Sequence, residues 1–322
     1  MRRVLLGPIV AAALVCGLAP AVAQSYPDRP IRLIVPFPPG GPNDIVARVV
    51  AQSMSEDLKQ PIVIENRAGA GGVTGTDAVA KAAPDGYTIA VTSSGALAIS
   101  QSLQRMPYET LRDLKPVTLV ATVAELLVVP GTSEAKTLPE FVKLAQAKPG
   151  SFNYASTGPG GMPHLAAELL KTAAKFDAVH VPYGGAAPAV TDLLGGRVEM
   201  MFADIPVLLP HVQSGKLRAL AVGSSKRAPA LPEVPTTVEQ GFPGVLAENW
   251  YGMVAPAATP ADIVAKLQAA TAKALRSPDV QQKLSSQGAV LVGGSSAEFA
   301  AYIEAETKKW AEVIRVAGVK LQ

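Results

Sequence analysis

IRLIVPFPPGGPNDIVARVV, residues 31–50, joins a short apolar run to an amphipathic segment through a double glycine. The apolar run at 31–35 is ended by Pro36, which predicts a buried strand. From residue 45 to residue 58 the apolar side chains recur at helical spacing, which predicts a helix. A strand therefore feeds a helix across the two glycines, and an α/β lobe should grow from this unit.

The residues that follow continue the alternation. Strands are predicted at 62–65 and 87–92, with an alanine-rich helix between them at 73–83 that Pro84 ends. Three strands separated by two helices predict a parallel arrangement in which the strands are buried on both faces.

A second alternation of strands and helices begins at 126–129. Further strands are predicted at 152–156, 178–183, 198–203 and 217–222, and helices at 164–174, 187–194 and 207–212. A proline-rich stretch after Gly223 should be irregular, and 250–254 predicts a strand. The C-terminal part is predicted to be mostly helical. The apolar stripe of its last helix, which runs to about Val316, should dock on the first lobe.

This pattern predicts that the chain crosses between two α/β lobes twice, near Thr122 and near Trp250. Lobe one would comprise residues 24–122 and 251–322, and lobe two residues 123–250. Two crossover segments would form a hinge.

Composition excludes several classes of protein. The chain has 322 residues, of which 48% are hydrophobic, and this length corresponds to roughly two domains of ~150 residues. Its 29 basic and 26 acidic residues nearly balance and aromatic residues are only 5%, so the basic stripe and stacking surface that nucleic acids require are missing. The single cysteine means that burial, not disulfides, must stabilise the fold.

The N-terminus has the pattern of an export signal. Arg2 and Arg3 precede an apolar stretch, and Ala21, Val22 and Ala23 form a small-x-small cleavage site, so residues 1–23 are predicted to be a secretory signal peptide. A retained membrane anchor is the alternative. Lipoprotein cleavage at Cys16 is disfavoured by the preceding valine. Export to the periplasm is compatible with solute capture, hydrolysis or a role in the cell envelope. It argues against chemistry that needs ATP or NAD.

The double glycine recurs in the second lobe. PGGP at 39–42 and PGGMP at 159–163 each stand between a predicted strand and a predicted helix. Ligands of open parallel sheets bind beyond the carboxyl ends of the strands, where a helix N-terminus offers unpaired amides to an anion. Either loop alone could be an ordinary tight turn, but their paired occurrence favours an anion site between the lobes.

The loops favour a carboxylate over a phosphate, because neither contains Lys or Arg and no P-loop sequence is present. Hydroxyl groups near the predicted strand ends could add donors, although ordinary turn chemistry would also explain them; these are Ser93, Ser94, Ser156 and Thr157. Asp204 could receive an amino group or a hydroxyl at the far end of a ligand, or could cap a helix.

No catalytic or metal-binding constellation is recognisable. The three histidines, His164, His180 and His211, are too widely spaced for a zinc-binding helix pair or a Cys/His nucleophile, and the nucleophile-elbow pattern is absent. His164 begins a predicted helix, where it could pack or donate to a ligand. A non-enzymatic protein without metal or cofactor is expected.

The chain resembles the Bug or TctC family, the extracytoplasmic solute receptors of tripartite tricarboxylate transporters. The resemblance covers almost the whole chain after the signal peptide. The residues that carry it are Tyr26, Val35 to Gly41, Asp44, Arg48, Glu65 to Arg67, Gly69, Gly72, Pro84 to Tyr87, His164, Leu165, Glu168, Val181 to Tyr183, the 192–196 segment and the 250–256 segment.

The resemblance implies a type II, Venus-flytrap periplasmic binding protein that closes over a small organic carboxylate and delivers it to membrane permease subunits. It implies that the ligand is gripped by two sets of residues: Phe37, Pro39, Gly40, Gly41 and Asp44 in one lobe, and Ser156, Thr157, Gly158, Gly161 and His164 in the other. Pro42, Met162 and Pro163 depart from the polar residues common in the family, which predicts a more apolar pocket. A monomer is expected. A ligand sensor for a sensor kinase and an exported α/β hydrolase are the alternatives.

Overall fold

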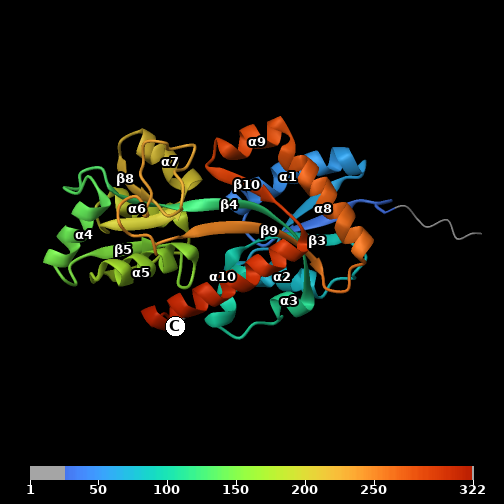
Figure 1. The fold of residues 1–322 in the computed structure, drawn as a ribbon, viewed down its shortest axis with the longest axis horizontal. Helices are drawn as coiled ribbons and strands as arrows, with labels where there is room; N and C mark the ends of the chain where they lie inside the picture. Colours follow the sequence, from blue (N-terminus) through green and yellow to red (C-terminus); the bar gives the residue numbers. More distant parts are fainter. Residues whose placement is uncertain (1–25, 321–322) are drawn as a thin grey trace, which may run out of the picture.

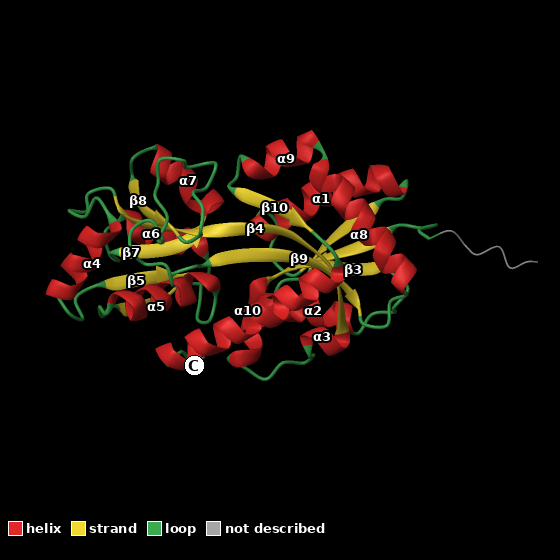
Figure 2. Cartoon of the chain, viewed as in Figure 1, coloured by secondary structure: helices red, strands yellow, loops and turns green. Residues whose placement is uncertain are grey.

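The computed structural model describes residues 26–320, and the predicted signal peptide lies outside them. The described chain forms two α/β lobes that lie side by side along the long axis of the molecule (Figure 1). Two long strands run between the lobes, and helices cover the outside of the sheets (Figure 2).

The first lobe is built on three parallel strands, as predicted. β1 (Ile31–Val35) pairs in parallel with β2 (Ile62–Asn66) and β3 (Thr88–Ser93). The connecting helices are α1 (Pro42–Leu58) and α2 (Val73–Ala80), and β3 is followed by short helical turns at Gly95–Ile99 and Ser100–Ser102. α3 (Thr110–Asp113), α8 (Ala261–Arg276), α9 (Pro278–Ser285) and β10 (Ala289–Gly293) complete this lobe.

The second lobe repeats the strand and helix alternation. β5 (Asn153–Ser156) pairs in parallel with β6 (Val179–Pro182) and with β7 (Met200–Asp204), and β8 (Leu217–Val222) lies at the other side of this sheet. Its helices are α4 (Leu138–Ala147), α5 (Met162–Ala174), α6 (Ala186–Leu194) and α7 (Ile205–Gln213).

The crossover strands β4 (Leu114–Pro130) and β9 (Glu248–Pro256) join the lobes. Up to Ala124, β4 pairs with β9 and β10; from Glu125 onward it pairs antiparallel with β7 and β8. The change of partner therefore falls between two neighbouring residues. The predicted lobe boundaries at residues 122 and 250 stay a prediction, because both strands run through them without interruption.

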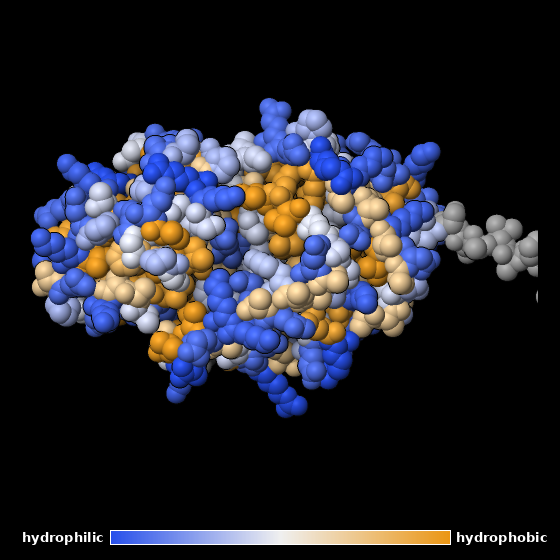
Figure 3. Space-filling model, viewed as in Figure 1, coloured by the Kyte–Doolittle hydropathy of each residue, from blue (hydrophilic) through white to orange (hydrophobic). Residues whose placement is uncertain are grey.

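Several expectations need correction. The strand predicted at 126–129 is only the end of β4, which is 17 residues long. β4 absorbs two register shifts against β9, near Pro116 and Leu119, and one against β8 after Leu127. β2 is not buried on both faces: it lies at the sheet edge, and Val63 is 54% exposed. The mostly helical C-terminal part contains the edge strand β10, which was not predicted. Hydrophobic surface gathers around β10 on the face shown in Figure 3.

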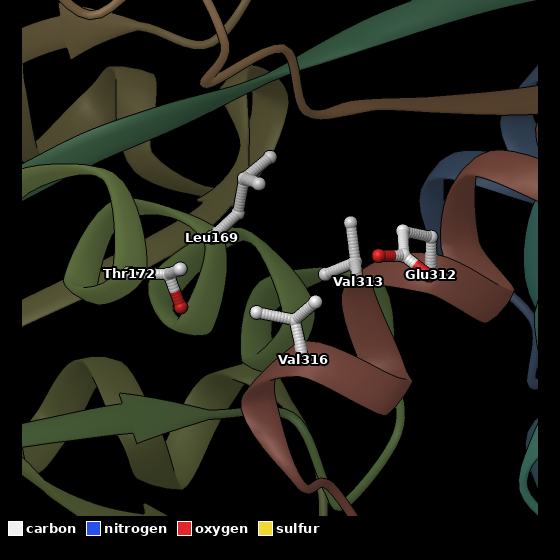
Figure 4. Close-up of a pocket in the computed structure, with 5 residues that line it drawn as sticks. All are labelled: Leu169, Thr172, Glu312, Val313 and Val316. Carbon is white, nitrogen blue, oxygen red and sulfur yellow. The ribbon is translucent and has the colours of Figure 1, made fainter.

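The last helix, α10 (Ser296–Ala317), does not dock on the first lobe alone. Phe299 and Ile303 belong to a core cluster of the first lobe, whereas Trp310 and Ile314 join the cluster of the second lobe. Beyond them, α10 and α5 line a small cavity of about 190 Å³ (Figure 4). The helix is long enough, at 22 residues, to span the junction between the lobes.

Among residues 26–320, no helix is both long and apolar enough to cross a membrane.

Candidate functional site

A cavity of about 830 Å³ lies at the junction of the two lobes. Its walls come from the loops before α1 and α5, the end of β3 and the first turn of α6. Glu125 of β4, Asp204 of β7, and Asn249 and Tyr251 of β9 also line it. Both glycine-rich loops therefore face one shared space.

The first glycine loop opens the N-terminus of α1. Gly40 has φ +82°, a conformation that favours glycine, and its amide donates a hydrogen bond to Asp44 Oδ2 over 2.9 Å. Gly41 is the N-cap residue, with φ −78° and ψ 166°. Amides of the first helical turn have no intrahelical partner, so they are available to a ligand.

The second glycine loop repeats this geometry before α5. Gly160 has φ +73°, and its amide donates to Nδ1 of His164 over 2.9 Å. Gly161 is the N-cap residue, with φ −74° and ψ 165°. In both loops the first glycine is held by a side chain four residues later, and the second glycine begins the helix.

Neither N-cap requires glycine for steric reasons. A Cβ on Gly41 would come no closer than 3.7 Å to Pro38 O, and a Cβ on Gly161 no closer than 3.6 Å to its neighbours. Their φ angles suit any residue, and Ser, Thr, Asp or Asn would cap the helix better. The chain therefore leaves two helix ends open toward the cavity.

Asp44 supports the first loop from behind and does not line the cavity. Its carboxylate accepts hydrogen bonds from Gly40, from Arg48 Nε over 2.8 Å and from Asn66 Nδ2 over 2.7 Å. Burial alone would raise the pKa of Asp44, but the hydrogen bonds from Arg48, Gly40 and Asn66 outweigh burial and lower it. A charged Asp44 therefore anchors the loop.

His164 supports the second loop in the same way. Its ring stacks on His180 with centroids 3.8 Å apart and an interplanar angle of 11°, and His180 stacks in turn on Tyr154. Because Nδ1 accepts from Gly160, the imidazole must be neutral. Burial, followed by the nearby charges of His180 and Lys171, lowers the pKa of His164 to about 4.

Ser156 also lies behind the second loop. Its Oγ accepts from the amide of Gly158 over 3.1 Å and lies 2.7 Å from His180 Nε2. Since Ser156 is fully buried, its hydroxyl is used inside the protein.

A cluster of polar side chains lies at the junction where β4, β7 and β9 meet. The antiparallel register places Glu125 directly opposite Asp204. Tyr251 OH donates to Asp204 Oδ2 over 3.1 Å, Asn249 Nδ2 lies 3.4 Å from the same oxygen, and Ser94 Oγ donates to Asn249 over 2.8 Å. Chain positions 94, 125, 204, 249 and 251 are thus brought together only by the two crossovers.

Ten of the thirteen predicted site residues line the cavity. These are Phe37, Pro39, Gly40, Gly41, Ser93, Ser94, Thr157, Gly158, Gly161 and Asp204. Asp44, Ser156 and His164 do not line it, because their polar atoms turn back to hold the loops. Pro42, Met162 and Pro163 line it and give both loops an apolar surface.

The sequence reasoning missed six polar residues that line the cavity: Asn43, Ser100, Gln104, Glu125, Asn249 and Tyr251. Asn43 is 3% exposed, and within the described chain neither polar atom of its side chain has a partner. Its position beside the double glycine was the available signal. Glu125 could have been noticed as an acidic residue inside an apolar strand.

Between residues 26 and 320 no three His, Cys, Asp or Glu side chains are placed to hold a metal ion together.

Comparison with known proteins identifies the family. The TctC model, described as "Tripartite tricarboxylate transporter family receptor", matches residues 46–319. BugT of Bordetella pertussis is 42% identical over 308 residues, which cover 94% of this chain and 94% of BugT.

Two similar solved structures contain small acids. MatC (Rpa3494) from Rhodopseudomonas palustris, solved with bound malate, is 35% identical with a TM-score of 0.80 and covers 90% of this chain and 100% of its own. Rpa4515 from R. palustris, solved with adipate, is 35% identical with a TM-score of 0.84 and covers 92% of this chain and 99% of its own. With its two-lobe fold, its family match and these relatives, the chain belongs to the Bug/TctC family of tripartite tricarboxylate transporter receptors.

Proposed function

We propose that this protein captures a small organic carboxylate between its lobes in the periplasm and delivers it to the membrane permease of a tripartite tricarboxylate-type transporter. The observation that carries the proposal is that Gly41 and Gly161 open two helix N-termini onto one cavity. Family membership and the malate and adipate bound to two relatives support the class of ligand.

Backbone donors of this kind are sufficient for useful affinity. A hydrogen bond to a charged group contributes roughly 1.5 to 3 kcal/mol, and micromolar binding requires about 8 kcal/mol. Four or five donors therefore suffice. We assign these to the first-turn amides of α1 and α5 that carry an N–H, which excludes Pro42 and Pro163, and to the side-chain amide of Asn43. Ser93 and Thr157 are further hydroxyl donors.

Asp44, Ser156 and His164 take positioning roles in this proposal. Each holds a loop amide from behind, so each would affect the ligand through the shape of the loop. We place the lobe boundaries at 122/123 and 250/251, so that closure would bend the crossover strands β4 and β9.

The test is a thermal-shift screen of the purified mature chain against mono-, di- and tricarboxylates, aromatic acids and amino acids. A ligand at 100 times its Kd should add about 2.7 kcal/mol to the free energy of unfolding. Gly161→Leu should abolish the shift by filling the cavity. Gly244→Leu is the matched control, because Gly244 is exposed and a Cβ there meets nothing within 4 Å.

A shift that survives in Gly161→Leu, or the absence of a shift with every acid, would contradict capture by the two loops. Delivery is tested separately in cells. Deleting the gene should abolish growth on the ligand. Normal growth with loss of a transcriptional response would contradict delivery and favour sensing, and chemical conversion of a bound acid would contradict a role limited to binding.

A further inference from the structure

Two carboxylates face each other at the cavity, on neighbouring strands. Glu125 and Asp204 are directly opposite in the antiparallel register of β4 and β7, so their side chains project from the same face of the sheet. Glu125 is 0% exposed and lines the cavity. Inside the described range, both of its carboxylate oxygens and Asp204 Oδ1 lack a hydrogen-bond partner.

Such an arrangement is unfavourable in the empty protein. A buried carboxylate without a partner loses its hydration without compensation, and a second carboxylate beside it adds repulsion. Burial raises the pKa of Glu125 well above its usual range, and the neighbouring Asp204 raises it further. Burial also raises the pKa of Asp204 to about 6, against the hydrogen bonds from Tyr251, Asn249 and a protonated Glu125.

The surroundings offer no compensating charge. Among the described residues that line the cavity, Glu125 and Asp204 are the charged ones, and none is Lys, Arg or His. The nearby Asn249 amide lies between Asp204, Tyr251 and Ser94 and does not reach Glu125. Until a donor arrives with the ligand, the three carboxylate oxygens can therefore be satisfied only by a proton that the two acids share.

The cavity is consequently polarised. The helix N-termini at the glycine loops carry partial positive charge, whereas the strand junction carries the two acids. A second carboxylate on the ligand would meet repulsion at the strand junction. An ammonium group there would supply up to three donors and an opposite charge.

We propose that the ligand is a zwitterionic aminocarboxylate, whose carboxylate lies on the two glycine loops and whose ammonium group lies between Glu125 and Asp204. This inference rests on the proposed function, because it takes the carboxylate end as given there. It adds the chemistry of the other end: selection for a cation and against a second acid.

The experiment compares matched ligands by isothermal titration at pH 7.5. For each chain length from three to six carbons, the ω-amino acid, the plain monocarboxylate and the dicarboxylate are titrated, together with the α-amino acid. At the best length, an aminocarboxylate should bind at least about tenfold more tightly than its monocarboxylate and dicarboxylate counterparts, as expected for a buried charge-assisted pair.

Variants test whether the two acids cause this preference. Glu125→Gln and Asp204→Asn should each weaken aminocarboxylate binding about tenfold or more while changing monocarboxylate binding less than about threefold. Glu304→Gln, an exposed acid on α10, is the matched control and should change neither. Monocarboxylate binding by the variants also shows that they are folded.

The outcomes separate this inference from the function on which it rests. Tighter binding of dicarboxylates than of aminocarboxylates, or an unchanged preference in both variants, overturns the role of Glu125 and Asp204 and leaves carboxylate capture standing. If no acid of any class binds, both proposals fail.

Discussion

Gly41 and Gly161 adopt the same backbone conformation at the start of two helices in different lobes, with φ/ψ of −78°/166° and −74°/165°. Each follows a glycine of positive φ, and each stands before a proline-containing first turn. Two helix ends that could be capped by a side chain are left open at one cavity, which suits them to bind an anion from outside.

Gly161→Asp should therefore stabilise the empty protein and destroy carboxylate binding. The aspartate would cap α5 with its own carboxylate and gain a few tenths of a kcal/mol over glycine. The same carboxylate would occupy the place of the ligand. Chemical denaturation measures the gain in stability. Titration with a carboxylate that the wild type binds measures the loss of binding.

Pro260→Asp is the matched control for that variant. Pro260 is the exposed N-cap residue of α8, away from the cavity lining, so the substitution adds the same charge at the same kind of position. Binding should be unchanged. Equal loss of binding in both variants would point to net charge rather than to the open helix end.

Glu306 should be a large contributor to stability at the junction of the lobes. It accepts hydrogen bonds from Nε1 of Trp250 over 3.1 Å and of Trp310 over 2.8 Å, and both indoles are fully buried. Glu306→Ala leaves two buried donors unpaired and should lower the free energy of unfolding by about 2–4 kcal/mol. Glu306→Gln keeps an acceptor and should cost less than half as much in urea denaturation.

The exposed Glu304 on the same helix provides the comparison. Glu304→Ala should change the free energy of unfolding by less than about 0.5 kcal/mol. A loss in Glu306→Ala no larger than this would mean that the two indole bonds do not hold α10 in place.

Acid should weaken the second glycine loop through His164. Its pKa is about 4 in the folded chain against an ordinary 6.5, so the folded state binds this proton less readily than the unfolded state. Above pH 6.5 the neutral imidazole contributes about 2–3 kcal/mol to the free energy of unfolding, and this contribution is lost as the pH falls toward 4. Stability and ligand affinity, measured across this range, should both fall.

His164→Asn isolates the effect, because its amide oxygen can accept from Gly160 without titrating. Between pH 6.5 and 4 this variant should lose less stability than the wild type. His211→Asn serves as the control and should follow the wild type. If the free energy of unfolding of His164→Asn fell with pH as steeply as that of the wild type, the role of the imidazole would be contradicted.

Removing one of the two facing acids should stabilise the protein without ligand. Glu125 and Asp204 have raised pKa values, so the stability lost through their ionisation is absent when both are protonated at low pH. The loss from Asp204 is complete above about pH 6, its folded pKa, and the loss from Glu125 grows as the pH rises further. Glu125→Gln should raise the free energy of unfolding by about 1–3 kcal/mol at pH 8, the usual cost of a buried polar group without a partner, and by less at pH 5. An equal gain at both pH values would show that the gain does not come from charge.

The local units of this protein could be predicted from its residues. The strand, double glycine and helix at 31–58 and at 153–174 depend on neighbours in the chain: apolar periodicity, a proline that ends the strand, and glycines that allow the turn. The second-lobe strand at 217–222 was predicted with the boundaries that the structure has. Family membership followed from the same local patterns and is confirmed by comparison.

Long-range pairing accounts for what could not be predicted. β4 was recognised only at its apolar end, because its length depends on β9 and β10, which follow it by more than a hundred residues. α10 showed an apolar stripe, but the stripe does not say that its first half meets one lobe and its second half the other.

By themselves, the residues determined two α/β lobes and two open helix ends, since backbone conformation and hydrophobic spacing are properties of short segments. Only the tertiary structure decided what faces those helix ends. Glu125 and Asp204 are far apart in the chain and become neighbours because β4 and β7 pair antiparallel. The electrostatic character of the cavity is therefore set by strand register, which no local pattern encodes.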